Sequence, residues 1–573
     1  NEKHGHLFGY WFGHDMFKPP YEVYPEMAEG AVLFGGTDPG RFNPTYMIFC
    51  ESFIPASKKP RDPDFDRRDV YIITQNALAD NTYLDYIRAH YFRSAQKDLP
   101  FFQEMLRSTK EKELNLSTNW FARSFSPADN AMMGLGSFVE KKRKARGLYP
   151  AKEIYTPSVK DSENAYLQYM SEAAFRKANN QLKPGEIVEE TPDGRILVQG
   201  QAAVMAINAL LTKVIFDENP DHEFYIEESM PLEWMYPHLS PFGIIMKINR
   251  EEVPAITEEM LQQDHEFWSK YMDRLIGNWV DEDTTIEEVV KFAEDVYLKG
   301  DFSNFKGDPK FVRDDWGQKA FSKLRSGIAG IYAWRLGPQC PEHLRPKTIE
   351  EEQRLLEEAD FAFRQSLALC PSSPEAVFRY SNLLAMTQRV DDAILITETC
   401  YKFDYENEGI GQLLQQLHRM KQGQAQLGQI QNSIQQLEQM YLSNKTNLDV
   451  AYKLMSNYVL TLRTNDAVRV MDELLADQNA PAETILTVAS AYNDLKQYER
   501  LELALIRLVE VIPENPEAWF DLAGTQALMG KKELALPTLS KTMELSRARR
   551  AKNPSAVDLA RKARGDHRFN ALR

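Results

Sequence analysis

A glycine-rich, polar segment at residues 33–42, with the sequence LFGGTDPGRF, has residue types that bind small ligands. Gly36 allows a ligand to approach the backbone closely. Thr37 and Asp38 offer hydrogen bonds, and Arg41 can hold an anion through two parallel bonds. Both the G-x-G-x-x-G pattern and the Walker lysine are missing, so we expect neither a dinucleotide nor ATP. The alternative is a plain turn, because Asp-Pro-Gly is a favourable turn triplet.

A second polar segment, TQNALADNTY at residues 74–83, follows another apolar run. Gln75, Asn76 and Asn81 could contact the same ligand if the two preceding strands are neighbours, because α/β folds bind ligands at the carboxyl ends of their parallel strands. The alternative is that Asp80 or Asn81 only caps the helix expected to begin next. We treat Gly36, Thr37, Asp38, Arg41, Gln75, Asn76 and Asn81 as the candidate ligand-binding set.

The amino-terminal segment HGHLFGYWFGHD offers His4, His6, His14 and Asp15 as weak candidates for a metal site. The alternative is that these residues are surface and packing side chains. We therefore predict no metal and no cofactor, and the sequence shows no catalytic set such as Ser-His-Asp or H-E-x-x-H. The four cysteines form no C-x-x-C pair and are expected to be free thiols, with a single disulfide as the alternative.

The elements that would position these residues are typical of an α/β domain over residues 1–254. Short β-branched or aromatic runs predict strands at residues 31–36, 69–75, 223–228 and 243–249. Helices are expected at residues 46–53, 82–90 and 202–214. This alternation predicts a parallel, Rossmann-like sheet. We expect residues 98–180 to be an insertion of helices and loops, and ETPDGRILVQG to form a hairpin with Asp-Gly as its turn.

The second half of the chain is expected to be an all-α tetratricopeptide-repeat solenoid. Unit starts at Asn447, Pro481 and Pro516 follow each other at intervals of about 34 residues, which is the tetratricopeptide period. Our predicted divisions are a helical bridging region at 255–345, first repeats at 346–408, a Gln-rich helical hairpin or coiled-coil insertion at 409–446, further repeats at 447–550 and a basic tail at 551–573. Stacked repeats commonly bind a peptide or protein partner.

The Gln-rich insertion has apolar residues at alternating spacings of three and four, which is a coiled-coil pattern. They are Leu427, Ile430, Ile434, Leu437 and Tyr441. Two interpretations stay open. The segment is either a hairpin packed within the repeat array, or a helix for self-association or for a partner.

Composition and net charge exclude several classes of function. The 573 residues are 43% hydrophobic and 27% charged, as in a folded globular protein, and the net charge is −16. Such an acidic chain is unsuited to binding nucleic acid.

The stretch from Lys541 to Arg573 differs from the rest of the chain in charge, with ten Lys and Arg against three acidic side chains. A second basic run, KKRKARG at residues 141–147, is expected to be a solvated helix face. The most apolar stretch, at residues 202–216, is too short to span a membrane.

Long blocks of the sequence resemble one known family. The resemblance is carried by five blocks: FGHDMF, YPEMAEGAVLFGGTDPGRFNPTYMIFCESF, FDRRDVYIITQNALADNTYLDYIRAHY, EFYIEESMPLEWMYPHLSPFGIIMKIN and VRDDWGQKAFSKLRSGIAGIYAWR. They are similar to the extracytoplasmic part of bacterial multi-pass membrane proteins of a domain of unknown function, classed with O-mannosyltransferase-like (GT-C) glycosyltransferases. The resemblance covers roughly residues 8–95 and 200–335. Where many members read N-G-D-N-D-T-F-P, this chain reads GGTDPGRF.

The resemblance implies a membrane bundle outside this sequence, followed by a soluble α/β region and repeats. It also implies that catalytic residues lie in that bundle, so none is assigned here. We therefore expect the extracytoplasmic, membrane-attached portion of a glycosyltransferase-like protein, with its repeats binding a protein or peptide. The bundle itself and self-association through the Gln-rich helices are further expected contacts. The alternatives are a free-standing repeat scaffold, or an enzyme using the 37–41 crevice with an acid–base pair that the sequence does not reveal.

Overall fold

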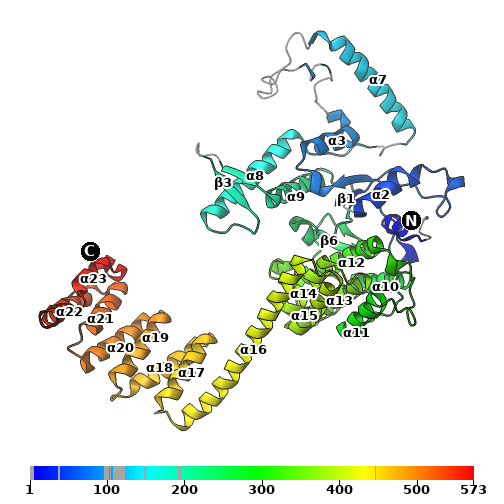
Figure 1. The fold of residues 1–573 in the computed structure, drawn as a ribbon. Helices are drawn as coiled ribbons and strands as arrows, with labels where there is room; N and C mark the ends of the chain where they lie inside the picture. Colours follow the sequence, from blue (N-terminus) through cyan, green and yellow to red (C-terminus); the bar gives the residue numbers. More distant parts are fainter. Residues whose placement is uncertain are drawn as a thin grey trace. The chain divides into compact units, whose positions relative to one another are not determined.

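The computed structural model describes residues 6–36, 39–95, 102, 105–106, 123–147, 150, 152–191, 196–445 and 447–572. The chain divides into two compact units, Asn1–His418 and Arg419–Arg573. Unit 1 contains the sheets and the first group of helices, and unit 2 is helical (Figure 1). Each unit is described by itself below.

A five-stranded sheet lies at the centre of the α/β part of unit 1. Its strands are β1 (Val32–Gly35), β2 (Tyr71–Thr74), β5 (Phe224–Ile226), β6 (Leu239–Phe242) and β7 (Ile245–Ile248), in the order β2-β1-β5-β7-β6. β1 is parallel to β2 and β5, whereas β7 is antiparallel to β5 and β6. The sheet is therefore mixed, and our prediction of a parallel Rossmann-like sheet holds only for three strands. Two residues connect β6 to β7, and a connection that short joins only antiparallel strands.

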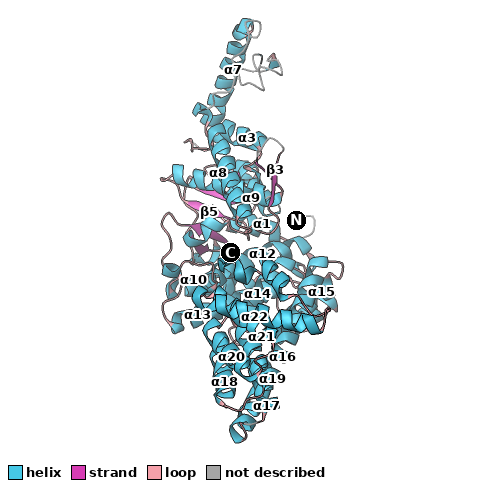
Figure 2. Cartoon of the chain, turned by 90° about the vertical axis from the view of Figure 1, so that its left-hand side faces the viewer, coloured by secondary structure: helices cyan, strands magenta, loops and turns pink. Residues whose placement is uncertain are grey.

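A smaller antiparallel sheet, β3 (Ile187–Glu190) and β4 (Ile196–Gln199), packs on two helices, α8 (Val159–Ala178) and α9 (Gln201–Glu218). This is the hairpin that we predicted, although the Asp-Gly turn lies outside the described residues. Figure 2 shows the strands of unit 1 among a majority of helices. Within the predicted insertion, the described residues include α7 (Ser126–Ala145) and α8.

Helices make up the rest of unit 1. They are α1 (Phe8–Asp15), α2 (Pro39–Phe49), α3 (Asn81–Tyr91), α10 (Glu258–Asp273), α11 (Ile286–Phe292), α12 (Asp315–Leu336), α13 (Ile349–Leu369), α14 (Pro374–Met386) and α15 (Val390–Phe403). One hydrophobic core runs from Phe8 to Leu417 and includes both the sheet and these helices. The region that we expected to be a bridge, residues 255–345, is therefore packed into the same core. All four cysteines are free thiols, as expected.

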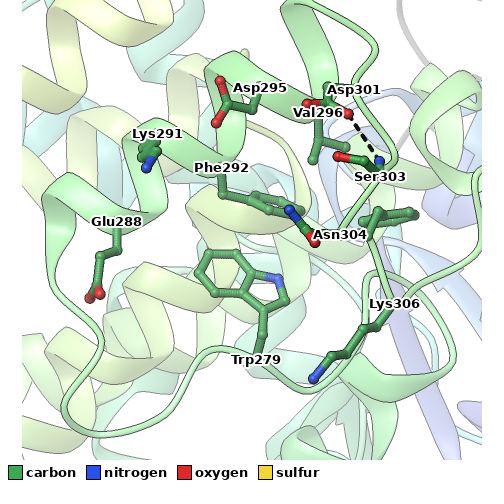
Figure 3. A pocket seen from close by; sticks show the side chains of 11 residues that line it. Trp279, Glu288, Lys291, Phe292, Asp295, Val296, Asp301, Ser303, Asn304 and Lys306 are labelled. Atoms are coloured by element: carbon green, nitrogen blue, oxygen red, sulfur yellow. Dashed lines mark hydrogen bonds between the residues drawn. The ribbon is translucent and has the colours of Figure 1, made fainter.

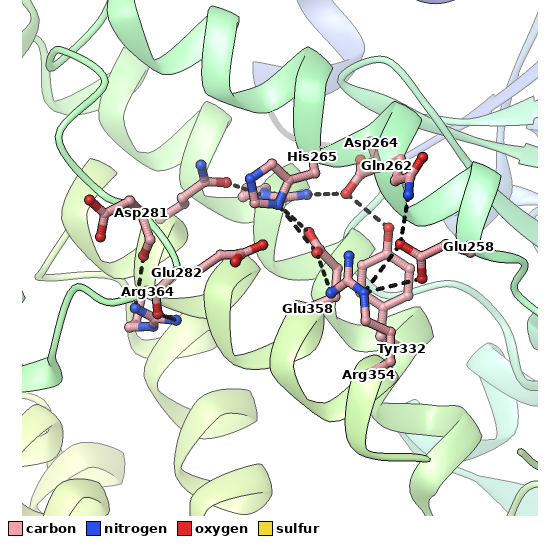
Figure 4. Close-up of polar contacts among 12 residues, drawn as sticks. Glu258, Gln262, Asp264, His265, Asp281, Glu282, Tyr332, Arg354, Glu358 and Arg364 are labelled. Carbon is pink, nitrogen blue, oxygen red and sulfur yellow. Dashed lines mark hydrogen bonds and ion pairs between the residues drawn. The ribbon is translucent and has the colours of Figure 1, made fainter. Parts of the chain in front are cut away.

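A buried polar network joins α10, α12 and α13 (Figure 4). Arg325 Nη1 on α12 donates to Asp264 Oδ2 on α10 at 2.6 Å, and both side chains are fully buried. The hydroxyl of Tyr332 donates to the same carboxylate oxygen at 2.8 Å. Arg325 Nε donates to Gln365 Oε1 on α13 at 2.8 Å. Burying two charges is costly, so this pair holds the helices in place only while both partners remain.

Unit 2 is an array of helix pairs of the tetratricopeptide type. Its helices are α17 (Leu448–Leu460), α18 (Thr464–Ala476), α19 (Ala482–Asp494), α20 (Tyr498–Val511), α21 (Pro516–Leu528), α22 (Lys532–Lys552) and α23 (Leu559–Gly565). The capping residues that precede α17, α19 and α21 are Asn447, Pro481 and Asn515. They recur at the tetratricopeptide period of about 34 residues. The structure therefore confirms the predicted repeats in this half of the chain.

One hydrogen bond recurs with the repeat. The hydroxyl of Tyr458 donates to Glu438 Oε1 at 2.6 Å, and the hydroxyl of Tyr492 donates to Asp472 Oδ1 at 2.6 Å. Both the two tyrosines and the two carboxylates are one repeat apart in the sequence. The first helix of each pair is thus tied to the helix before it in the same way, which sets the spacing between neighbouring pairs.

The Gln-rich segment forms one helix, α16 (Glu408–Ser443), and not the hairpin that we predicted. The boundary between the two units falls within it. In unit 2 the side chains of Ile434 and Tyr441 are buried in the core with α17 and α18, while Leu427 is 52% exposed. Most of the coiled-coil pattern is therefore used to pack the helix against the repeats.

We expect Arg325→Met to lower the free energy of unfolding by about 3–5 kcal/mol, because it leaves the Asp264 carboxylate buried without its partner. The control is Lys319→Met on the same helix, which removes a partly exposed ion pair with Asp315 and should cost less than about 1 kcal/mol. Urea unfolding followed by circular dichroism measures both. Equal losses in the two variants would contradict a structural role for the buried pair.

Candidate functional site

The two polar segments singled out in the sequence lie side by side at one edge of the large sheet. β1 and β2 are neighbours and parallel, so Gly36 after β1 and Gln75 after β2 are at the same end. α9 holds the second segment, because Asn208 Nδ2 donates to the carbonyl of Asn76 at 3.0 Å and its Oδ1 accepts from the Ala79 N–H at 2.7 Å. Thr37 and Asp38 lie outside the described residues.

A crevice of about 280 Å³ opens at this edge. Charged side chains of both signs line it, beside an apolar wall. The polar lining is Arg41, Glu227, Glu228, Lys319, Lys323, Ser373 and Glu375, and the apolar lining includes Phe12, Trp316, Ala320, Leu324 and Pro374. These residues come from α1, α2, the end of β5, α12 and the start of α14, so the crevice exists only in the folded unit.

Glycine allows close packing at the strand ends. A Cβ added to Gly35 would lie 2.1 Å from Glu227 Oε1, and one added to Gly36 would lie 1.9 Å from Glu228 Oε2. A side chain at either position would therefore require the carboxyl group of Glu227 or Glu228 to move. The absence of a side chain at Gly35 and Gly36 lets this pair of carboxyl groups approach the end of β1.

Glu227 is the most strongly perturbed acid of the crevice. Burial raises the pKa of its carboxyl well above the usual value, and the nearby Glu228 raises it further. Arg41, Lys323 and a backbone hydrogen bond from Gly36 act in the opposite direction without offsetting burial. Burial thus favours the protonated form of this carboxyl, which can donate a hydrogen bond.

Glu228 is held in a different way from Glu227. It forms an ion pair with Lys323 at 2.9 Å and accepts a hydrogen bond from the Ser229 N–H at 2.9 Å. The Ser229 hydroxyl also donates to Glu375, which ties the end of β5 to the start of α14. The crevice thus contains two adjacent carboxyl groups in unlike environments, an arrangement that suits one acid and one base.

Several buried polar atoms at this edge have no hydrogen-bond partner in the described part of the chain. They are Arg41 Nη1, Gln75 Nε2 and Oε1, Asn76 Oδ1 and Glu227 Oε1. Buried polar atoms are normally paired, and an unpaired one costs free energy. In the candidate site these atoms are groups that a bound polar molecule could contact.

Asn81 is not part of this crevice. It is exposed at the start of α3, and Asp80 caps that helix by accepting a hydrogen bond from the Thr82 N–H at 2.7 Å. Our capping alternative was therefore correct for Asp80. Sequence reasoning missed Glu227, Glu228 and Lys323. The available signal was two carboxylates directly after the apolar run of β5.

The candidate metal ligands have protein partners instead. His14 is hydrogen-bonded to Asp15 at 2.9 Å and to Asp62 at 3.1 Å. Burial alone would lower the pKa of His14, but these two carboxylates outweigh it and raise that pKa. His6 lies 3.5 Å from Asp314, and His4 is outside the described residues.

Asp15 also accepts hydrogen bonds from the Tyr271 hydroxyl at 2.8 Å and from Arg274 at 3.1 Å. Among residues that the structure describes, no group of three His, Cys, Asp or Glu is placed to hold a metal. Within the same described ranges, no helix is long and apolar enough to cross a bilayer.

A second cavity of unit 1, of about 330 Å³, has an aromatic floor (Figure 3). The ring centroids of Trp279 and Phe292 are 4.3 Å apart, and those of Phe292 and Phe305 are 6.0 Å apart. Acidic and basic side chains both line it. Its unpaired buried polar atom is Trp279 Nε1, and it has no unpaired buried carboxyl among the described residues, so we place the candidate site at the strand ends.

Comparison with known proteins gives no family. No family model matches the chain, and no curated protein matches it. Among solved structures, MamA is 15% identical with a TM-score of 0.20, covering 32% of this chain and 96% of that one. YrrB, described as a TPR protein with an unusual peptide-binding site, is 14% identical with a TM-score of 0.18, covering 32% and 93%. Such weak likenesses carry no argument, and the repeats are established by the helix pairs themselves.

The raised pKa of Glu227 predicts a pH-dependent stability. Between the unfolded pKa and the folded one, only the folded chain keeps this proton, so the contribution of Glu227 to stability falls as pH rises. We expect Glu227→Gln to remove this loss, so that the stability of the variant relative to the wild type rises between pH 5 and pH 8. Urea titrations at both pH values measure it, with the exposed Glu259→Gln as control. A pH-independent difference would contradict a buried, protonated Glu227.

Proposed function

We propose that this protein is an interaction scaffold whose helical repeats bind a protein or peptide partner. The observation that carries the proposal is the position of the chain's own carboxyl-terminal segment. The predicted basic tail is folded. It forms α23 and a 3-10 helix at His567–Leu572, and that helix packs on α21, the first helix of the last pair.

The contacts of this segment resemble those of a bound peptide. The ring of Phe569 packs edge-on against Phe520 of α21 with centroids 5.3 Å apart. Arg568 Nη1 donates to Asp521 Oδ1 at 3.1 Å. A Cβ added to Gly524 would lie 2.9 Å from the Arg568 guanidinium, so the segment lies directly on the helix backbone. One aromatic and one basic side chain thus cover this face of α21.

The same face is open one repeat earlier. Leu486 of α19 holds the place in its repeat that Phe520 holds in the next, and it is 55% exposed where Phe520 is 1% exposed. Thr487 and Ser490 occupy the places of Asp521 and Gly524. Because the helices share one register, a partner peptide can contact α19 as the chain's own segment contacts α21. The exposed leucine provides the apolar anchor for such a peptide.

The matched variants are Leu486→Asp on α19 and Leu503→Asp on α20 of the same pair, where Leu503 is 66% exposed. We select peptides of about 16 residues, long enough for a few helical turns, by display against the full chain and measure their affinity by fluorescence anisotropy. We expect Leu486→Asp to weaken binding at least about tenfold, because it places a charge in the anchor position, and Leu503→Asp to leave it unchanged. Equal binding by both variants would contradict this location.

A second function is favoured by the unpaired atoms at the strand ends. We propose that the crevice of unit 1 binds a small ligand that carries groups of both charges, as a free amino acid does. Arg41 Nη1 supplies an unpaired cationic donor and Glu227 Oε1 an unpaired carboxyl oxygen. Phe12 and Trp316 supply an apolar wall for the rest of the molecule. Glu227 and Glu228 also supply the paired carboxyl groups that the enzymatic alternative requires.

We expect at least one of the common free amino acids, at about ten times its Kd, to stabilise the chain by about 1.4 kcal/mol. Thermal unfolding screens for the effect and calorimetry gives the affinity. Arg41→Gln and Glu227→Leu should each remove the stabilisation, while the exposed Arg61→Gln should retain it. No response to any amino acid at millimolar concentration would refute this ligand class.

The membrane-attached, extracytoplasmic setting remains part of our proposal, as does a link to glycosyl transfer. Both are supported only by the resemblance of the sequence blocks. The expected contact with a membrane bundle and the expected self-association likewise have no support beyond the sequence. The interaction scaffold is independent of all these points, because it depends on contacts within unit 2.

A further inference from the structure

Helix α7 in unit 1 is folded but almost unpacked. Of its 20 residues, only Asp129 is buried. No other described helix or strand lies along most of its length (Figures 1 and 2). An isolated helix of this length is marginally stable in water, and most helices are stabilised by packing of an apolar face. We therefore expect α7 to be stabilised by packing its apolar face against another surface.

The apolar residues of α7 form one stripe. The stripe consists of Met132, Leu135, Phe138 and Val139. Each of these residues lies three, four or seven positions from another, and such spacings place side chains on the same face of a helix. They are 53%, 61%, 54% and 45% exposed. Met133 is equally apolar and 49% exposed, but it points to the other side of the helix. The stripe is therefore a continuous exposed face and not a scatter of single residues.

A basic cluster continues this stripe at the carboxyl end of the helix. The cluster consists of Lys141, Lys142, Arg143, Lys144 and Arg146. It contrasts with the chain as a whole, which has a net charge of −16. Lys142 lies on the apolar face, with its Nζ 4.6 Å from the centre of the Phe138 ring. Long basic side chains can bury their stems in an apolar layer while their charges stay in water.

The acidic side chains of α7 lie away from the stripe. Glu140 is 3.8 Å from Arg93 of the body of unit 1, and Asp129 accepts a hydrogen bond from the Phe102 N–H at 2.8 Å. The helix thus presents the stripe and Lys142 on the side away from its carboxylates, whereas Lys144 pairs with Glu153 of the body of unit 1 at 3.7 Å. This distribution complements an apolar layer covered by negative charge. It does not suit an apolar protein groove, in which the basic cluster would lose its hydration without compensation.

We propose that α7 lies flat in the surface of an anionic lipid bilayer, with the stripe in the acyl boundary and the basic cluster among the headgroups. This contact is separate from partner binding by the repeats and from the ligand of the crevice, because none of their residues is shared. It requires no membrane-spanning segment in the described chain.

The test is co-sedimentation of the full chain with vesicles of phosphatidylcholine alone or with about 30% phosphatidylglycerol, which gives the charged surface that the cluster needs. We expect binding to the anionic vesicles and not to the neutral ones. Raising salt from about 0.1 M to about 0.5 M should weaken it, because the Debye length shortens.

Two matched variants separate the apolar stripe from charge alone. Leu135→Glu and Met133→Glu change the net charge equally on the same helix, but only Leu135 lies in the stripe. We expect Leu135→Glu to weaken vesicle binding at least about tenfold and Met133→Glu to do so far less. Lys141→Glu with Lys142→Glu should reduce binding by about fivefold or more for each residue. Urea unfolding should show wild-type stability for all these variants, because the replaced side chains are on the surface.

Three outcomes would overturn the proposal. The first is no binding to anionic vesicles at low salt. The second is equal binding to neutral and anionic vesicles. The third is equal loss in Leu135→Glu and Met133→Glu. If the chain instead self-associates and Leu135→Glu abolishes that association, the stripe is an interface between copies and not a lipid-binding face.

Discussion

The buried ion pair between Arg325 and Asp264 is the constraint on which unit 1 depends. It joins α12 to α10, and through Gln365 it joins both to α13. The same helix α12 reaches the large sheet and brings Trp316 and Lys323 to the crevice. Because charged groups at the centre of a core tolerate little displacement, the pair fixes the position of α12 in the core. The site at the strand ends thus depends on this contact, because Lys323 and Leu324 line the crevice and directly precede Arg325.

The crevice combines two strategies that recur in binding sites. Glycines at the end of β1 let the backbone approach a pair of carboxyl groups. Burial raises the pKa of one of these, Glu227, while Lys323 forms an ion pair with the other, Glu228. The unpaired donors and acceptors nearby keep a free-energy cost that a ligand can relieve. Unit 2 works differently, because its contact surface recurs with each helix pair, and the chain's own Arg568 and Phe569 occupy one copy of it.

Sequence reasoning located more of the fold than of the site. The strands β1, β2, β5 and β7 and the repeats of unit 2 follow from apolar runs and from spacing, which are local signals. The hairpin of β6 and β7, which makes the sheet mixed, was missed because Pro241 interrupts the run that would indicate a strand. For the Gln-rich segment the spacing of apolar residues left a hairpin and a coiled-coil helix open, and the structure has one continuous helix.

The sequence by itself determined that GGTDPGRF and TQNALADNTY each follow a strand, that the second half is a helical repeat, and that a basic run lies at residues 141–147. Only the tertiary structure decided which distant side chains meet. Glu227, Lys323 and Glu375 reach the crevice from three separate elements, and Asn81 turns away from it. The same is true of α7, whose apolar stripe remains uncovered. Contact and exposure depend on packing between segments far apart in the chain, and no local pattern encodes them.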